Sequence, residues 1–482
     1  MLFNSLDFAI FLPIVFLLYW FVFNKKVSYQ NVLVVLASYI FYGWGDWTFL
    51  SLILISTIID YSVGIGLSKE NNQTKRKVLL WISIIVNLGF LGFFKYYNFF
   101  IDNFISAFSF LGADITAGSL NIILPVGISF YTFQTLSYTV DIYKRKLEPT
   151  KDFIAFSAFV SFFPQLVAGP IERATHLLPQ FYAKRTFNRD KAVDGLRQIL
   201  WGLFKKIVIA DNCAHYANLI FNNSDAYSGS TLALGAFFFT FQIYGDFSGY
   251  SDIAIGTSRL FGVDLRRNFN FPYFSRDIAE FWRRWHISLS TWFRDYLYIP
   301  LGGSKGGVWM KVRNTFLIFI ISGFWHGANW TFVIWGALNA IYFLPLLITK
   351  SNRRNLNTIA EGKMFPTMKE FLGMLMTFSL TVLAWVFFRA NDLDHAFNYL
   401  SELFSSTLFT VPEFGGKIGA LISFLLIVVF MVIEWIGREG QYAMENIGLN
   451  WKRQYRWLFY YGLVLMIIGF QGKQQEFIYF QF

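Results

Sequence analysis

Charged residues are scarce in this chain. Asp, Glu, Lys and Arg make up 15% of its 482 residues, whereas a soluble domain carries about 25%. Hydrophobic residues reach 55% and aromatic residues 21%, and apolar runs recur from Leu6 to Phe470 with no long polar stretch between them. The composition excludes a soluble enzyme with one anchor. It predicts an all-α polytopic protein that forms a single membrane domain over residues 1–482.

Cysteine is nearly absent as well. The single Cys213 excludes an internal disulfide and any metal site built from several cysteines. Two nucleotide-binding motifs of soluble enzymes are also missing, namely the P-loop and the dinucleotide-binding GxGxxG. The histidines lack the HxxxH spacing of a zinc site. We therefore expect no bound metal or organic cofactor.

Basic residues outnumber acidic ones. Lys and Arg total 41 and Asp and Glu total 30, which gives a net charge of +11. In a membrane protein such an excess marks cytoplasmic loops and contacts with lipid headgroups. We expect membrane lipid, and no nucleic acid, among the partners. The first apolar run, Leu6–Phe23, lacks a basic segment before it and a small-residue cleavage site, so we expect a retained helix rather than a signal peptide.

The apolar runs predict about 11 transmembrane helices. Ile122–Asp141 is dotted with Ser, Thr, Gln and Tyr, which favours a helix buried among other helices or lining a cavity. Thr231–Ile255 carries Asp246 and Asp252 beside two glycines, which predicts a break that lines a wet interior. The plainer runs are Leu6–Phe23, Val27–Trp44, Phe49–Leu67, Val78–Phe94, Phe371–Phe388, Ile418–Trp435 and Trp457–Phe470.

Two of the five histidines lie between Glu280 and Trp335. Around His286, a helical projection places tryptophans on one arc and basic or hydroxyl side chains on the other, which predicts one amphipathic helix ended by Pro300. Two interpretations stay open: a functional histidine, or arginines that bind lipid phosphate beside a histidine that only packs on tryptophan. The two arcs are Trp282, Trp285, Leu289, Trp292 and Tyr296 against Arg283, Ser290 and Arg294.

The second histidine, His326, lies in the run Thr315–Leu347. A straight helix of that length would reach about 50 Å and exceed a hydrocarbon core of about 30 Å. Gly323 and Gly327 bracket the histidine, so we predict a kink there. A neutral imidazole inside a membrane can act as a general base, although a buried histidine can also simply bond a neighbouring carbonyl.

Several blocks of this sequence, in this order, resemble the membrane-bound O-acyltransferase (MBOAT) superfamily and, within it, the bacterial alginate O-acetyltransferase family. The resemblance covers the whole length of the chain. The blocks are FYGWGDW (41–47), PVGISFYTFQTLSYTVDIY (125–143), FFPQLVAGPIER (162–173), DFSGYSDIAIG (246–256), FWRRWHISLSTWFRDYLYIPLGG (281–303), SGFWHGANWTFVIWGALN (322–339), WVFFRA (385–390) and FIYFQF (477–482).

The resemblance implies a fold and two catalytic histidines. The fold would be a ring of spanning helices with re-entrant helices around a central tunnel, with a catalytic core over about residues 122–348. His326 would be the essential histidine, and His286 stands where relatives place Asn, Asp or His. One departure is Asn339, since family members often carry His at this position.

The resemblance also implies a mechanism and a substrate site. His326 would act as general base on a hydroxyl and then as general acid toward a thiolate leaving group. His286 would orient the acceptor or donate to the developing oxyanion. The donor would be acetyl-coenzyme A or an acyl carrier protein on the cytoplasmic side. Its expected contacts are Arg283, Arg284 and Arg294 on the phosphates, together with Ser290, Trp325 and Asn329.

The function implied is transfer of an acyl group, expected to be acetyl, across the bacterial inner membrane. The end product would be an O-acetylated extracellular or periplasmic polysaccharide such as alginate, made with a separate extracytoplasmic acetyltransferase as partner. Two alternatives remain at this point: D-alanyl transfer for teichoic acid modification, and a transporter or channel for a glycan.

Overall fold

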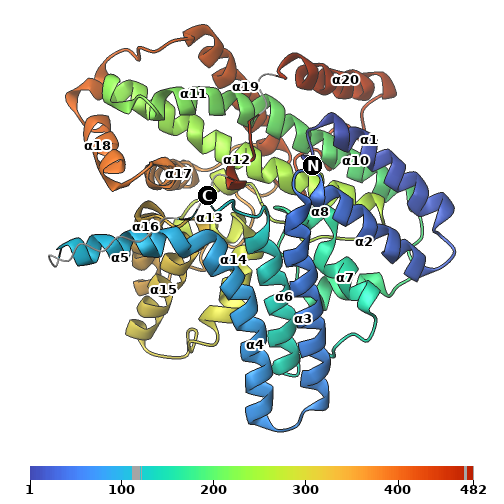
Figure 1. Cartoon of the computed structure of the whole chain (residues 1–482). Coiled ribbons are helices and arrows are strands. Elements are labelled where there is room, and N and C mark those ends of the chain that lie inside the picture. Colours follow the sequence, from blue (N-terminus) through green and yellow to red (C-terminus); the bar gives the residue numbers. More distant parts are fainter. Residues whose placement is uncertain (111–119, 121, 472–474, 481–482) are drawn as a thin grey trace. The chain divides into compact units, whose positions relative to one another are not determined.

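The computed structural model describes residues 1–110, 120, 122–471 and 475–480 (Figure 1). Gln481 and Phe482, which end the last block of the resemblance, lie outside the described residues. Helices account for all regular structure in the described residues, and no strand occurs among them. The predicted all-α class is therefore confirmed. The chain divides into two compact units, Met1–Ala192 with Thr257–Arg266, and Val193–Gly256 with Arg267–Phe482.

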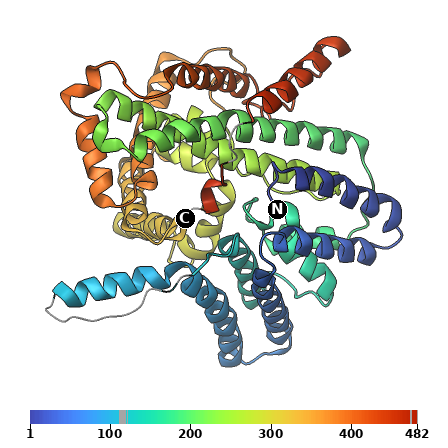
Figure 2. The same ribbon diagram turned by 45° about the horizontal axis from the view of Figure 1, so that its top comes forward.

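The first unit is built around α6 (Ile128–Tyr143), which packs against α3 (Leu50–Lys69) and α4 (Gln73–Leu91). These helices lie side by side in Figures 1 and 2. Nearly every side chain of α6 is buried, so the predicted internal helix is confirmed over Ile128–Tyr143, whereas residues 122–127 are not helical. The other helices of the unit are α1 (Leu6–Leu17), α2 (Val27–Gly43), α5 (Tyr97–Phe110), α7 (Phe153–Ser161), α8 (Phe163–Leu166) and α9 (Ala174–Leu177).

The polar side chains of these helices satisfy one another. Asp60 on α3 accepts hydrogen bonds from Ser83 Oγ at 2.5 Å and from Asn87 Nδ2 at 2.9 Å, both on α4. The hydroxyl of Thr139 on α6 lies 2.9 Å from Ser83 Oγ. Buried polar groups cost free energy unless they are paired, so this network permits three helices with polar faces to pack tightly.

The second unit contains the histidine blocks. Its helices are α11 (Asp211–Phe221), α13 (Ile278–Arg284), α14 (Ile287–Phe293), α15 (Val308–His326), α16 (Trp330–Ile348), α17 (Met368–Arg389), α18 (Leu393–Leu403), α19 (Lys417–Ile436) and α20 (Arg453–Gly469). The helices α10 (Arg189–Leu203) and α12 (Gly229–Leu260) run across the division between the units. A π-helical segment, η5 (Phe204–Ala210), joins α10 to α11.

Several helices have the length and composition of membrane spans. Within the described residues, five stretches are long and apolar enough to cross a membrane, and two shorter apolar helices precede them. The chain is thus a multi-pass membrane protein, while the total of about 11 spans stays a prediction. The five stretches are Trp47–Lys69, Gln73–Phe110, Trp330–Ile348, Met368–Arg389 and Lys417–Ile436, and the shorter helices are Leu6–Val22 and Val27–Gly43.

The predicted break inside 231–255 is wrong, because α12 is one unbroken helix over Gly229–Leu260. Its glycines provide close helix contacts instead. A Cβ atom on Gly249 would lie 2.8 Å from the carbonyl oxygen of Gly202, and one on Gly245 would lie 3.0 Å from that of Lys205. Glycine lets two helix backbones approach within van der Waals distance, so these residues position α12 against the segment that carries Lys205.

The predicted kink at His326 is also wrong. The run divides into two helices, α15 and α16, which lie side by side (Figure 1). A Cβ on Gly323 would lie 2.1 Å from Phe332 O, and one on Gly336 would lie 2.2 Å from Phe319 O. The two helices therefore cross with their backbones in contact. This crossing fixes the position of the last residue of α15, which is His326.

Candidate active site

His326 is placed by a helix end and the turn that follows it. Gly327 adopts an extended conformation with φ −163° and ψ 151°, which stops α15. Asn329 then caps α16, because its Oδ1 accepts a hydrogen bond from Thr331 N at 3.0 Å. An Asn at this position is a strong helix-start signal. The His326 side chain is buried, with 3% of its surface exposed.

His286 lies at a break in the helix that the sequence predicts as continuous. That prediction is wrong: α13 ends at Arg284, Trp285 is extended, and His286 has a left-handed backbone with φ 42° and ψ 54°. A non-glycine residue in this region is uncommon and signals a local constraint. The hydrophobic periodicity continues on both sides of the break, which is why the sequence pattern conceals it.

The constraint comes from a segment well before the break in sequence. Ile287 N donates to Asn268 O at 2.8 Å, and Asn270 N donates to Arg284 O at 2.9 Å. These bonds hold the chain on both sides of His286 against residues 268–270. The Asn268 side chain contacts the histidine itself, with its Oδ1 3.1 Å from His286 Nδ1.

The two imidazoles lie close together inside the second unit. Their ring centroids are 6.5 Å apart. His286 is 1% exposed, and burial lowers its pKa well below the usual range, so its ring is neutral at physiological pH. Aromatic rings surround the pair: Trp325, Trp335, Phe388 and Tyr479 lie within 5.5 Å of His326, and Phe247 lies 4.6 Å from His286, as centroid distances.

A segment near the C-terminus completes these surroundings, and no pattern in its residues predicts that role. Ile478 N donates to Asp246 Oδ2 at 2.6 Å. Lys206 Nζ pairs with Asp246 at 2.9 Å and donates to Gln475 O at 3.1 Å. These contacts bring the Tyr479 ring to 5.5 Å from the ring of His326. The FIYFQF block carries the only signal, as part of the family resemblance.

The predicted substrate residues divide into those that bond or pack within the protein and those that line a pocket. Arg283 donates to the carbonyl oxygens of Asn352 and Asn355 at 2.7 and 2.8 Å. Arg284 is buried and pairs with Glu280 at 2.8 Å. The guanidinium groups of both arginines therefore hold the chain together in this structure. Asn329 likewise acts as a helix cap, whereas Trp325 packs against His326 with 4.9 Å between ring centroids.

Ser290 and Arg294 do share a pocket, which has a cavity volume of about 260 Å³ and is partly open to solvent. Arg294 is exposed and pairs with the neighbouring Asp295 at 2.8 Å. Arg353, which no sequence motif marks, is a second exposed cation on the lining. One face of α15 runs along this pocket and continues at helical spacing to His326, through Thr315, Ile318, Phe319 and Ser322.

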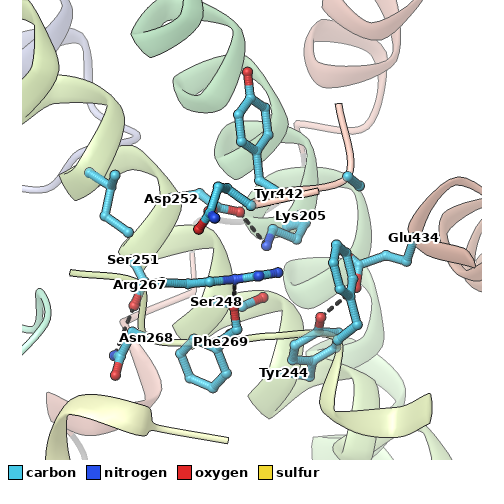
Figure 3. Close-up of a pocket in the computed structure, with 14 residues that line it drawn as sticks. Lys205, Tyr244, Ser248, Ser251, Asp252, Arg267, Asn268, Phe269, Glu434 and Tyr442 are labelled. Atoms are coloured by element: carbon cyan, nitrogen blue, oxygen red, sulfur yellow. Dashed lines mark hydrogen bonds and ion pairs between the residues drawn. The ribbon is translucent and has the colours of Figure 1, made fainter. Parts of the chain in front are cut away.

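A buried charged cluster lies beside Asn268 (Figure 3). Lys205 and Asp252 form an ion pair at 2.5 Å, and Gln198 Nε2 donates to the same carboxylate at 2.7 Å. Tyr244 donates its hydroxyl hydrogen to Glu434. The charged side chains of the cluster are thus paired with one another. These contacts join α12 to η5, which carries Lys205, and to α19, which carries Glu434. No group of three or more His, Cys, Asp or Glu side chains suited to a metal occurs in the described part of the chain.

Comparison with known proteins identifies the family. The model of the membrane-bound O-acyltransferase family matches residues 47–386. The chain is 38% identical to a probable alginate O-acetylase of Azotobacter vinelandii over 452 residues, covering 93% of this chain and 87% of that protein. It is 34% identical to a peptidoglycan O-acetyltransferase of Helicobacter pylori over 532 residues, covering 100% and 98%.

A more distant relative acts on another polymer. A teichoic acid D-alanyltransferase of Streptococcus thermophilus is 29% identical over 312 residues, covering 57% of this chain and 71% of that protein. The two O-acetyltransferases match nearly the full chain, and the resemblance seen in the sequence is confirmed. The chain belongs to the membrane-bound O-acyltransferase family and is a multi-pass membrane acyltransferase.

Proposed function

We propose that this acyltransferase moves an acetyl group from a cytoplasmic thioester donor toward a hydroxyl of a cell-surface polysaccharide. The observation that carries the proposal is the pair of buried imidazoles, 6.5 Å apart, in a centre lined by aromatic rings. Acyl transfer needs a base for the hydroxyl and an acid for the leaving thiolate. A neutral imidazole supplies both functions in turn.

In the proposed reaction His326 takes the proton of the acceptor hydroxyl as its oxygen attacks the thioester carbonyl carbon. The tetrahedral intermediate then collapses, the carbon–sulfur bond breaks, and the imidazolium returns the proton to the thiolate. The products are an ester and a free thiol. The aromatic rings around His326 exclude water, which would otherwise hydrolyse the thioester.

The pocket beside α15 is the proposed donor site. Phosphopantetheine is a narrow chain with a thiol at one end and a phosphate at the other, and Arg294 and Arg353 provide cations on the exposed part of the pocket. Ser322 lines the same pocket one helical turn before His326. A donor bound along this face of α15 would present its thioester toward the histidine. Acetyl-coenzyme A and an acyl carrier protein both carry this phosphopantetheine arm.

The acceptor polymer is proposed from the relatives. The two full-length relatives are named for alginate and for peptidoglycan, which both offer sugar hydroxyls. We propose alginate or a similar polysaccharide as the final acceptor, with a separate extracytoplasmic acetyltransferase that completes the transfer. Mass spectrometry of the released acyl groups separates acetyl from D-alanyl. Unaltered glycan export in a variant that lacks ester formation argues against a transporter.

The test of the proposal is His326→Ala in cells that carry the full chain. We expect O-acetyl ester on the polysaccharide to fall about 10²-fold or more, with normal abundance of the protein in the membrane. His395→Ala is the matched control, because His395 lies in the first turn of α18 and accepts a bond from Asn391 N at 3.3 Å. Wild-type ester in a normally abundant His326→Ala protein would refute the proposal.

A further inference from the structure

The Asn268 side chain is fully buried, and both its amide nitrogen and its amide oxygen form hydrogen bonds. Its Nδ2 donates to Ser251 Oγ on α12 at 3.2 Å, a contact drawn in Figure 3. Its Oδ1 is 3.2 Å from Ser288 N, 2.8 Å from Ser288 Oγ and 3.1 Å from His286 Nδ1. The amide therefore lies between α12 and the start of α14, in contact with one of the two histidines.

The orientation of this amide follows from a backbone donor. Ser288 N is a peptide N–H, so the Asn268 atom that faces it must accept. A flipped amide would put two donors against each other in a buried place, which is costly. Oδ1 thus faces α14, and an amide oxygen can only accept hydrogen bonds. The ring nitrogen of His286 that contacts it must carry the hydrogen.

We infer that Asn268 is a positioning residue that fixes the neutral imidazole of His286 with its hydrogen on Nδ1 and its lone pair on Nε2. This inference rests on the proposed function for its catalytic meaning, but the tautomer itself does not. In that tautomer Nε2 can accept a hydrogen bond and cannot donate one. His286 would then accept a hydrogen bond from a neighbouring hydroxyl of the acceptor and so orient the attacking hydroxyl, whose own hydrogen goes to His326. It would not donate to the oxyanion.

The backbone reinforces this arrangement. The bonds from Ile287 N to Asn268 O and from Asn270 N to Arg284 O fix the register of the two segments. The left-handed conformation of His286 turns its ring toward the Asn268 amide. A second residue that orients a catalytic imidazole in this way is a common arrangement, because a neutral histidine in the wrong tautomer presents a donor where an acceptor is required.

The tautomer can be measured without any assay of activity. We would label the full-length protein with ¹⁵N-histidine, reconstitute it in lipid vesicles and assign the His286 signals in solid-state NMR spectra by comparison with His286→Asn. At neutral pH we expect a protonated Nδ1 and an unprotonated Nε2. A protonated Nε2 on neutral His286 would overturn the inference, whatever the protein does to a thioester.

Substitutions test the positioning role. Asn268→Asp keeps an oxygen acceptor and Asn268→Leu removes it. In acetyl transfer from acetyl-coenzyme A by vesicles with the full chain, we expect at least about 10% of wild-type kcat for Asp and a loss of about 10²-fold for Leu. The Leu variant should also lose the Nδ1–H signal. Equal kcat for Leu and Asp, or an unchanged tautomer in Leu, would overturn the inference.

A matched control separates positioning from folding. Asn314 is also fully buried, and its Nδ2 donates to the carbonyl oxygens of Leu301 and Gly303 at 3.2 Å. Asn314→Leu removes a comparable set of buried bonds far along α15 from His326. We expect reduced abundance with unchanged kcat per folded protein and unchanged His286 signals. If His326→Ala remains active while the NMR result holds, the proposed function fails and the tautomer assignment stands.

Discussion

Two regions of the second unit combine glycines with titratable side chains: the middle of α12 and the junction of α15 with α16. In α12 the glycines contact neighbouring backbone, and Asp252 is neutralised by Lys205 at 2.5 Å. The helix stays whole. At the junction the titratable group is His326, which lies among aromatic rings where the helix ends.

The difference lies in which partners the titratable groups have. A buried carboxylate needs a cation, and α12 receives it from a packed neighbour, so its polar residues stabilise the fold. An imidazole can stay neutral in an apolar place and still exchange a proton. We therefore expect substitutions in the middle of α12 to reduce stability, and substitutions at the junction to reduce activity.

The largest effect on this comparison should come from Lys205→Met. It leaves Asp252 buried without its cation, which costs about 3–5 kcal/mol of stability. We expect a lower midpoint of thermal unfolding in detergent and less protein in the membrane. The double variant Lys205→Met with Asp252→Leu should recover much of the loss, since both charges are then absent. Normal stability of the single variant would contradict the assignment of α12 to the fold.

Substitutions of His286 test the expectation that changes near the paired histidines reduce activity. His286→Leu should lower acetyl transfer about 10²-fold, whereas His286→Asn should keep part of the activity because an amide oxygen can also accept a hydrogen bond. His286→Gly serves as control for the backbone, since glycine adopts the left-handed conformation without a ring. Purified protein in vesicles gives the three rates. Wild-type activity in the Leu variant would return His286 to a purely structural role.

A pair of glycine substitutions compares the two regions directly. Gly336→Ala puts a Cβ 2.2 Å from Phe319 O, and Gly249→Ala puts one 2.8 Å from Gly202 O. Each should cost about 1–3 kcal/mol through overpacking. We expect thermal midpoints to fall in both, but kcat per folded protein to fall only in Gly336→Ala, because displacement of α15 moves His326. An equal loss of kcat in both variants would contradict the expectation that only the α15–α16 junction affects activity.

The smallest effect should come from the exposed part of the donor pocket. Arg353 and Arg354 are adjacent and exposed, and of the two only Arg353 lines the pocket. Arg353→Gln should raise KM for acetyl-coenzyme A about two- to fivefold, in line with about 0.2–1 kcal/mol for an exposed ion pair. Arg354→Gln is the control and should leave KM unchanged. A matching rise in both would mean a general charge effect.

The sequence predicted features that depend on local signals and missed those that depend on distant partners. The burial of α6 follows from its polar-flecked apolar pattern, and the two histidines were found through the blocks around them. The break before His286 depends on Asn268, and the unbroken α12 depends on Lys205 and Lys206, which lie far away in the sequence. No periodicity within either helix encodes those partners.

The dependence on distant partners also explains why the structure gives Arg283 and Arg284 internal contacts that the sequence did not predict. Arg283 lies on the predicted polar arc and the resemblance adds Arg284 as a phosphate contact, yet their guanidinium groups bond to carbonyls of residues 352–357 and to Glu280. That later segment carries no motif that would pair it with them. Ser290 and Arg294 do line the pocket, and the role of the pocket stays a prediction.

The left-handed backbone at His286 restricts which amino acids can occupy this position during evolution. The conformation favours Gly, Asn, Asp and His, and the contact required of the side chain demands a hydrogen-bond acceptor. Asn, Asp and His satisfy both conditions, and these are the residues that the family resemblance places there. In a library of all twenty amino acids at position 286 we expect survivors to be confined to this set, with β-branched residues depleted most strongly.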